Sequence, residues 1–146
     1  MIFDQVKKQI IEAMKAKDEL RKSTLKMLSS ALHNAVIAKQ AELNEEEELD
    51  IVRKEAKKRR DAIDIYDKVG ESARAEKERK ELEILKKFLP QELSDEELEK
   101  LVSESISQIK AKDIKDMGKV IGMVMGKAKG RTDGGKVADL VKSKLL

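Results

Sequence analysis

Several residue types are missing or scarce in this chain of 146 residues. It has no cysteine and no tryptophan, one proline, one tyrosine, two phenylalanines and a single histidine. Without cysteine there is no disulfide framework, thiolate zinc site or cysteine nucleophile, and one histidine cannot form a multi-histidine metal site. Folding must therefore rest on packing alone, and the sequence predicts neither a metal site nor a bound cofactor.

Long apolar runs are also missing. The first residues, MIFDQVKKQIIEAMK, lack the apolar core of a signal peptide. No segment approaches the roughly 20 apolar residues that a membrane span requires. We therefore expect a cytoplasmic protein without a membrane partner.

Charged residues make up 42% of the chain, and the formal net charge is +3. Abundant Ala, Leu, Glu, Lys and Met, with few aromatic residues, favour helix over strand, so we expect an all-α protein. The charges are unevenly distributed near the end of the chain. Residues 91–108 hold one lysine and six acids, whereas residues 109–146 hold ten lysines and arginines and four aspartates.

Apolar residues at helical spacing predict about four helices in the first 90 residues. The first follows Asp4 and ends near Lys17, and the second runs from an N-cap at Asp18 to about residue 43. Asn44 followed by four glutamates predicts the start of a third helix, which ends at Gly70. A fourth helix, from residue 72 to residue 89, is ended by Pro90.

The segment PQEL, residues 90–93, is the expected boundary between an N-terminal helical subdomain (1–90) and a C-terminal one (91–146). Ser94 and Glu97 form a capping box that starts a new helix. We expect three helices here, over about 95–111, 116–129 and 133–145. Their candidate caps are Asp113, Asp116 and Asp133.

The second of these helices contains glycine at every fourth position, at Gly118, Gly122, Gly126 and Gly130. Each glycine costs a helix interior roughly 1 kcal/mol relative to alanine. At 100° per residue, a continuous apolar face forms opposite the glycines, consisting of Met117, Val120, Ile121, Val124, Met125 and Ala128. The exposed face is then mostly backbone, bordered by Lys119, Lys127 and Lys129.

Several interpretations of this glycine face are open. The lysines exclude a membrane-spanning helix pair, although small residues at this spacing let helices approach closely. Another helix of the same subdomain could cover the glycines, or they could reflect loose packing without function. Alternatively, a flat basic surface without side chains could accept an RNA backbone with its exposed bases.

The next segment has the G-x-x-x-x-G-K spacing of a phosphate-binding loop, from Gly130 to Lys136. Val137 stands where Ser or Thr should hold magnesium, and a helix rather than a strand precedes the loop, so nucleotide hydrolysis is not expected. A turn in which Asp133 caps the last helix fits better. With Arg131 and Lys136 beside it, that helix start could hold a phosphate.

Other motifs give weaker predictions. The basic run KEAKKRR, residues 54–60, is expected to be a solvated face, with an auxiliary RNA contact as the alternative. His33 is expected to be a packed or surface residue, since no third group completes a triad with it and Ser29 or Ser30. The carboxylates of residues 45–48 are expected to start a helix, because adjacent residues do not share one helical face. No catalytic or metal-binding group of residues emerges.

The run DMGKVIGMVMGKAKGRTDGGKVADLV, starting at Asp116, resembles the tail domain of GatB, a subunit of the tRNA-dependent amidotransferase. The stretches LRKSTLKMLSSALHNA, KKRRDAIDIY and EKERKELEILKKFLPQELSDEEL resemble the YqeY family, whose members carry this tail. The resemblance spans nearly the whole chain. It implies a cytoplasmic, all-helical protein with a four-helix N-terminal part and a three-helix tail.

The resemblance also implies tRNA binding by the tail and no amidation, because the catalytic parts of the amidotransferase are missing here. We therefore expect a non-catalytic tRNA-binding accessory protein. The alternatives are a protein-interaction module and a partner in a glutamine-dependent carbon–nitrogen ligase complex that supplies the active site. The expected RNA-binding residues are Gly118, Lys119, Gly122, Gly126, Lys127, Lys129, Gly130, Arg131 and Lys136.

Overall fold

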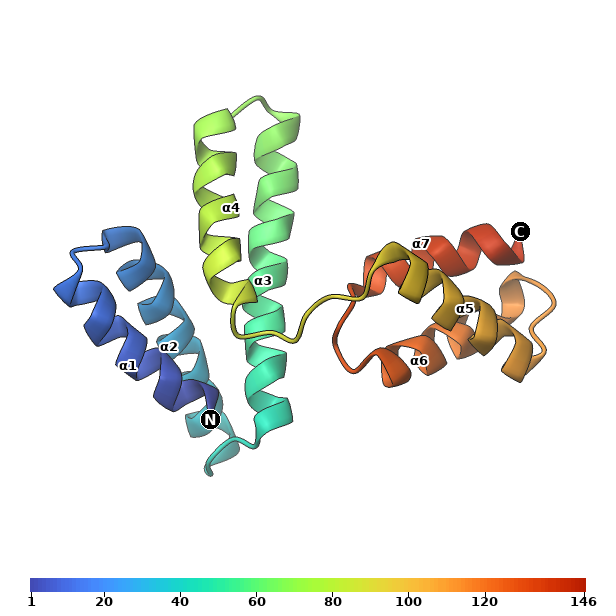
Figure 1. The fold of residues 1–146 in the computed structure, drawn as a ribbon, viewed down its shortest axis with the longest axis horizontal. Helices are drawn as coiled ribbons and strands as arrows, with labels where there is room; N and C mark the ends of the chain where they lie inside the picture. The colour runs from blue at the N-terminus through green and yellow to red at the C-terminus, as the bar shows by residue number, and fades with distance from the viewer. The chain divides into compact units, whose positions relative to one another are not determined.

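The computed structural model describes residues 1–146 and consists of seven α-helices and one short 3-10 helix, with no strand (Figure 1). The prediction of an all-α protein is confirmed. The chain divides into two compact units, Met1–Leu89 and Pro90–Leu146. None of the helices is long and apolar enough to cross a membrane.

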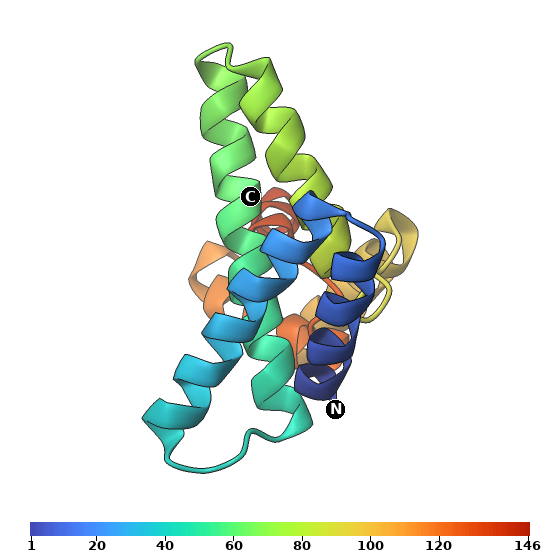
Figure 2. The same cartoon turned by 90° about the vertical axis from the view of Figure 1, so that its left-hand side faces the viewer.

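The first unit holds two helical hairpins, which Figure 2 shows from the side. The first hairpin is α1 (Ile2–Lys15) with α2 (Glu19–Lys39), and the second is α3 (Glu45–Lys68) with α4 (Ser72–Lys86). The predicted caps are present: Asp18 accepts a hydrogen bond from the Arg21 amide, and Asn44 forms a capping box with Glu47. The expected end of α2 near residue 43 was wrong, because Gln40 adopts a left-handed conformation (φ 60°) and ends the helix.

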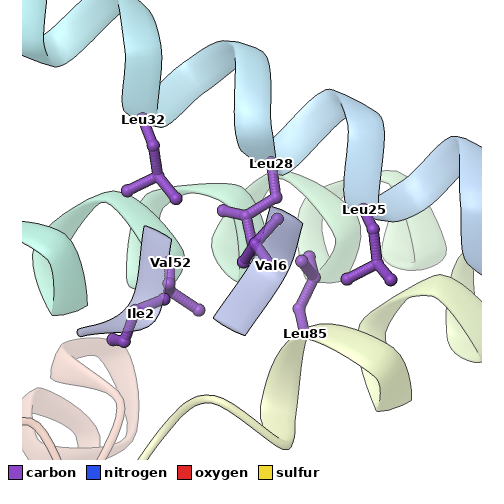
Figure 3. Close-up of a cluster of buried hydrophobic side chains, with 7 residues drawn as sticks. All are labelled: Ile2, Val6, Leu25, Leu28, Leu32, Val52 and Leu85. Atoms are coloured by element: carbon purple, nitrogen blue, oxygen red, sulfur yellow. The ribbon is translucent and has the colours of Figure 1, made fainter. Parts of the chain in front are cut away.

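The core of this unit forms where all four helices meet (Figure 3). Three leucines of α2 spaced by one helical turn point into it, and the other three helices contribute the rest: Ile2, Val6, Leu25, Leu28, Leu32, Val52 and Leu85. Complete burial of each such side chain contributes roughly 1.5–3 kcal/mol. The single apolar stripe of α2 therefore holds both hairpins together.

The basic run at residues 54–60 is only partly the solvated face that was expected. Arg59 is 6% exposed and lies among carboxylates of α3 and α4, with its Nε 3.0 Å from Glu81 Oε2 and 3.6 Å from Glu78 Oε2. Glu55, one turn earlier, is also buried beside it. A buried guanidinium needs such partners, so Arg59 joins the two helices of the second hairpin.

The second unit contains α5 (Asp95–Ile109), the 3-10 helix η1 (Ile114–Asp116), α6 (Met117–Ala128) and α7 (Gly134–Leu145). Its core is formed by Leu98, Val102, Val120, Val124, Val137, Val141 and Leu145. The capping box of Ser94 and Glu97 is present, and Asp113 caps η1 through the Lys115 amide. Asp116 does not cap α6 with its side chain, because its carboxylate accepts a hydrogen bond from the Lys112 amide instead.

Candidate functional site

The glycines of α6 form an exposed surface. Gly118, Gly122 and Gly126 are all exposed, whereas Val120 and Val124 on the opposite face are fully buried. A Cβ atom added at any of the three glycines would meet no atom within 4 Å outside the local helix backbone. The alternative in which another helix of the same unit covers these glycines is therefore wrong. We call the three residues the glycine surface.

Gly130 does not belong to this surface, contrary to the helical-wheel prediction. Helix α6 ends at Ala128, after which Lys129 (φ 49°) and Gly130 (φ 76°) both adopt left-handed backbone conformations. Glycine tolerates this conformation without steric cost, so the fourth glycine ends the helix rather than extending its bare face. The expected step of four thus joins two different structural roles.

Two lysines of α6 lie beside the glycine surface. Lys119 follows Gly118 in the first turn and is exposed. Lys127 follows Gly126 in the last turn, is also exposed, and donates a hydrogen bond to Gln108 Oε1 at 2.6 Å. Lys129, exposed in the turn after the helix, adds a third cation near this end. These lysines make the surroundings of the bare backbone positive.

Arg131 has structural partners that the sequence did not indicate. Its Nε donates to the backbone oxygen of Gln91 at 2.8 Å, and its guanidinium lies 4.0 Å from Glu97 Oε2. Its own backbone oxygen accepts a hydrogen bond from the Leu93 amide at 2.7 Å. Arg131 therefore joins the α6–α7 turn to the segment before α5, and part of its charge is already compensated.

Lys136 lies apart from the glycine surface, at the start of α7. Its Nζ donates to Asp95 Oδ1 of α5 at 2.5 Å. This hydrogen bond raises the pKa of Lys136 and lowers the pKa of Asp95. The structure therefore does not bring Lys136 together with the lysines of α6.

The loop with phosphate-loop spacing is a helix cap. The preceding element is α6 rather than a strand, and Asp133 accepts a hydrogen bond from the Gly135 amide at 3.4 Å. The carboxylate of Asp133 thus lies at the helix start where a phosphate was considered, and two anions would repel each other there. This geometry argues against phosphate binding at the start of α7.

A groove of about 340 Å³ runs between α5 and α6 on the side of Lys127. Lys100 of α5 lines it together with Lys127 and Arg131, and the carboxylates of Glu97 and Glu104 line it as well. Sequence reasoning missed Lys100, although its spacing of three and four residues from the two glutamates places all three on one face of α5. The groove therefore has mixed charge, in contrast to the glycine surface.

No group of three or more histidine, aspartate or glutamate side chains lies close enough together to hold a metal ion. The site is therefore a surface of exposed backbone and lysines, and its chemistry is that of binding. Such a surface offers close approach and positive charge.

A family model described as Yqey-like protein matches residues 3–145. The chain belongs to this YqeY-like family. The predicted family resemblance is confirmed.

Three relatives place the YqeY-like chain further. The altered inheritance of mitochondria protein 41 of Lachancea thermotolerans is 35% identical over 108 residues, which cover 72% of this chain and 58% of that protein. An uncharacterized protein of Schizosaccharomyces pombe is 29% identical over 90 residues, which cover 62% of this chain and 73% of that protein. A glutamyl-tRNA(Gln) amidotransferase subunit of Thermococcus gammatolerans is 42% identical over 57 residues, or 36% of this chain and 9% of that protein.

Proposed function

We propose that this YqeY-like protein is a non-catalytic accessory protein that binds tRNA in the cytoplasm through its C-terminal unit. The observation that carries the proposal is the open glycine surface, where the backbone of Gly118, Gly122 and Gly126 is accessible and lysines stand on either side. The similarity to a segment of an amidotransferase subunit whose name includes a tRNA supports RNA as the ligand.

The proposed contact uses both features of the surface. Lys119, Lys127 and Lys129 neutralise phosphates, while the glycines let the sugar–phosphate chain or an exposed base approach the helix backbone. Arg131 is left out of the phosphate-binding set, because its guanidinium already binds Gln91 and Glu97. If about four phosphates are engaged, the logarithm of the affinity falls with the logarithm of the salt concentration at a slope of roughly −3 to −4.

The experiment is a titration of total tRNA at two salt concentrations against the wild type and the variant Lys119→Ala/Lys127→Ala/Lys129→Ala. We expect the variant to bind more weakly and with a shallower salt slope, by roughly 2 to 3. The matched control is Lys8→Ala/Lys15→Ala/Lys26→Ala, which removes the same charge from exposed positions of the N-terminal unit. Absence of tRNA binding at low salt, or an equal loss in both variants, contradicts the proposal.

A second candidate is a protein-interaction module in which the glycine surface receives a helix of a partner. The same open backbone favours it, because small residues let two helices pack closely. The partner could be a protein that supplies the active site of a glutamine-dependent carbon–nitrogen ligase, and the relative from Thermococcus gammatolerans motivates that choice. Binding of this kind depends little on salt, so a salt-insensitive complex that forms without RNA favours this candidate.

A further inference from the structure

A cavity of about 470 Å³ lies in the N-terminal unit, among α1, α2 and the start of α3. This volume is in the range of small-molecule sites, which combine apolar walls with a few polar groups. The cavity has this composition, since its wall includes Phe3, Lys7, Ser29, His33, Val36 and Glu48. Nothing in the proposed tRNA contact uses this cavity.

Glu48 is the unusual member of the wall. It is 1% exposed, and its Oε2 accepts a hydrogen bond from the Phe3 amide at 2.6 Å. Glu48 of α3 thus caps the start of α1, where a negative charge is favoured by the helix dipole. Its other oxygen, Oε1, is buried and receives no hydrogen bond. A buried carboxylate oxygen without a donor is costly, so a ligand that supplies the donor gains affinity.

The other charges of the wall indicate the sign of that ligand. Three carboxylates, those of Asp4, Glu42 and Glu48, line the cavity with a single lysine side chain, Lys7. The Lys7 ammonium lies 4.2 Å from the centroid of the Phe3 ring. The excess of carboxylates favours a cation that donates hydrogen bonds. The apolar walls favour a cation attached to an apolar body.

We infer that this cavity binds small primary amines with an apolar body, and that the ammonium group donates to Oε1 of Glu48. The apolar body then lies against Phe3 and Val36. This inference is independent of the proposed tRNA binding, because it concerns the other unit of the chain. Failure of either one leaves the other intact.

The test titrates the full-length, 15N-labelled protein with phenethylamine and, separately, with 2-phenylethanol, which has the same apolar body but no ammonium group. We expect the amide signals of Phe3, Ser29 and His33 to shift saturably with the amine. The expected dissociation constant is on the order of 1 mM, and the alcohol binds at least about tenfold more weakly. Absence of saturable shifts with the amine, or equal affinity for both compounds, overturns the inference.

Two variants locate the binding. Glu48→Gln keeps an oxygen for the Phe3 amide but places an NH2 donor where Oε1 stood, so affinity for phenethylamine falls at least about tenfold. The matched control is Glu45→Gln, an exposed carboxylate of the same helix start that does not line the cavity. Ser29→Leu fills the cavity from α2, leaves the contact between Glu48 and Phe3 in place, and abolishes binding even if Glu48→Gln fails to fold. Unchanged affinity in Ser29→Leu overturns the inference.

Discussion

The Nε atom of Arg131 donates a hydrogen bond to the backbone oxygen of Gln91, across 2.8 Å and forty residues of sequence. The backbone oxygen of Arg131 in turn accepts from the Leu93 amide. The irregular segment before α5 is thus held against the α6–α7 turn by both the side chain and the backbone of one residue. The conformation of this segment depends on a residue that its basic surroundings suggested as a phosphate ligand.

The first prediction concerns this connection. Arg131→Ala removes a charge-assisted hydrogen bond at a partly exposed position, so we expect the C-terminal unit to lose about 1 kcal/mol of stability. Hydrogen exchange of the Leu93 amide, followed by NMR, should accelerate because its acceptor is less firmly held. Lys127→Ala is the control, since Lys127 bonds to Gln108 and does not contact this segment. An unchanged exchange rate in Arg131→Ala contradicts the prediction.

The second prediction separates stability from binding on the glycine surface. The variant Gly122→Ala/Gly126→Ala adds methyl groups that meet nothing within 4 Å, so it should stabilise α6 by roughly 1–2 kcal/mol in total. The same methyl groups should weaken tRNA binding, because they hold the ligand away from the backbone. Urea unfolding and tRNA titration measure the two effects.

The control for this experiment is Gly135→Ala, which adds a methyl group at the start of α7 at ordinary contact distance from Asp133. It should leave the affinity for tRNA unchanged. A double variant of α6 that binds tRNA as tightly as the wild type would exclude backbone contact at the glycine surface.

The third prediction is a pH dependence that involves Asp95 and Lys136. The hydrogen bond from Lys136 keeps the pKa of Asp95 below its ordinary value in the folded protein. The contribution of Asp95 to stability is therefore complete above its unfolded pKa, about 3.9, and is lost as the pH falls through its lower folded pKa. In Lys136→Ala the pKa of Asp95 should rise toward the ordinary value, which an NMR titration of the carboxyl group detects. An unaltered titration midpoint would mean that the contact does not persist in solution.

The fourth prediction concerns the buried charges of the α3–α4 hairpin. Burial raises the pKa of Glu81, and Glu78 adds to this effect, so the ionised form of Glu81 is disfavoured in the folded protein. A raised folded pKa means that stability increases as the pH falls from neutral through that pKa. Glu81→Gln should therefore be neutral or stabilising at pH 7 and should reduce this pH dependence.

Replacement of the opposite partner should have the reverse effect. Arg59→Met leaves the carboxylates of Glu55, Glu78 and Glu81 without their shared cation, and we expect a loss of about 3–5 kcal/mol. Chemical denaturation at pH 5 and pH 7 tests both variants. Equal destabilisation by Glu81→Gln and Arg59→Met would contradict this account of the cluster.

Local signals in the sequence predicted the helices well. Asn44 with Glu47 and Ser94 with Glu97 are capping boxes in the structure, because such caps involve only residues three positions apart. The end of α2 was not predictable in the same way. Gln40 adopts a left-handed conformation that glycine or asparagine usually provides, so its residue type gave no indication.

The candidate site was predictable only where it depends on one helix. The wheel placed Gly118, Gly122 and Gly126 opposite the apolar face of α6, and they are exposed there. The partners of Arg131 and Lys136 could not be predicted, since Gln91 and Asp95 come from segments about forty residues earlier. Glu48 was expected only to start a helix, and its contact with Phe3 depends on the packing of α3 against α1.

The bare side of α6 has a consequence for the entropy of any complex that forms on it. Lysine and arginine side chains lose up to about 2 kcal/mol of rotamer freedom when a contact immobilises them, but glycine has no rotamers to lose. The conformational freedom of these glycines is given up when the helix folds, before any ligand arrives. A molecule that lies against Gly122 therefore meets a surface that is already ordered, and the entropic cost of recognition there falls on the ligand.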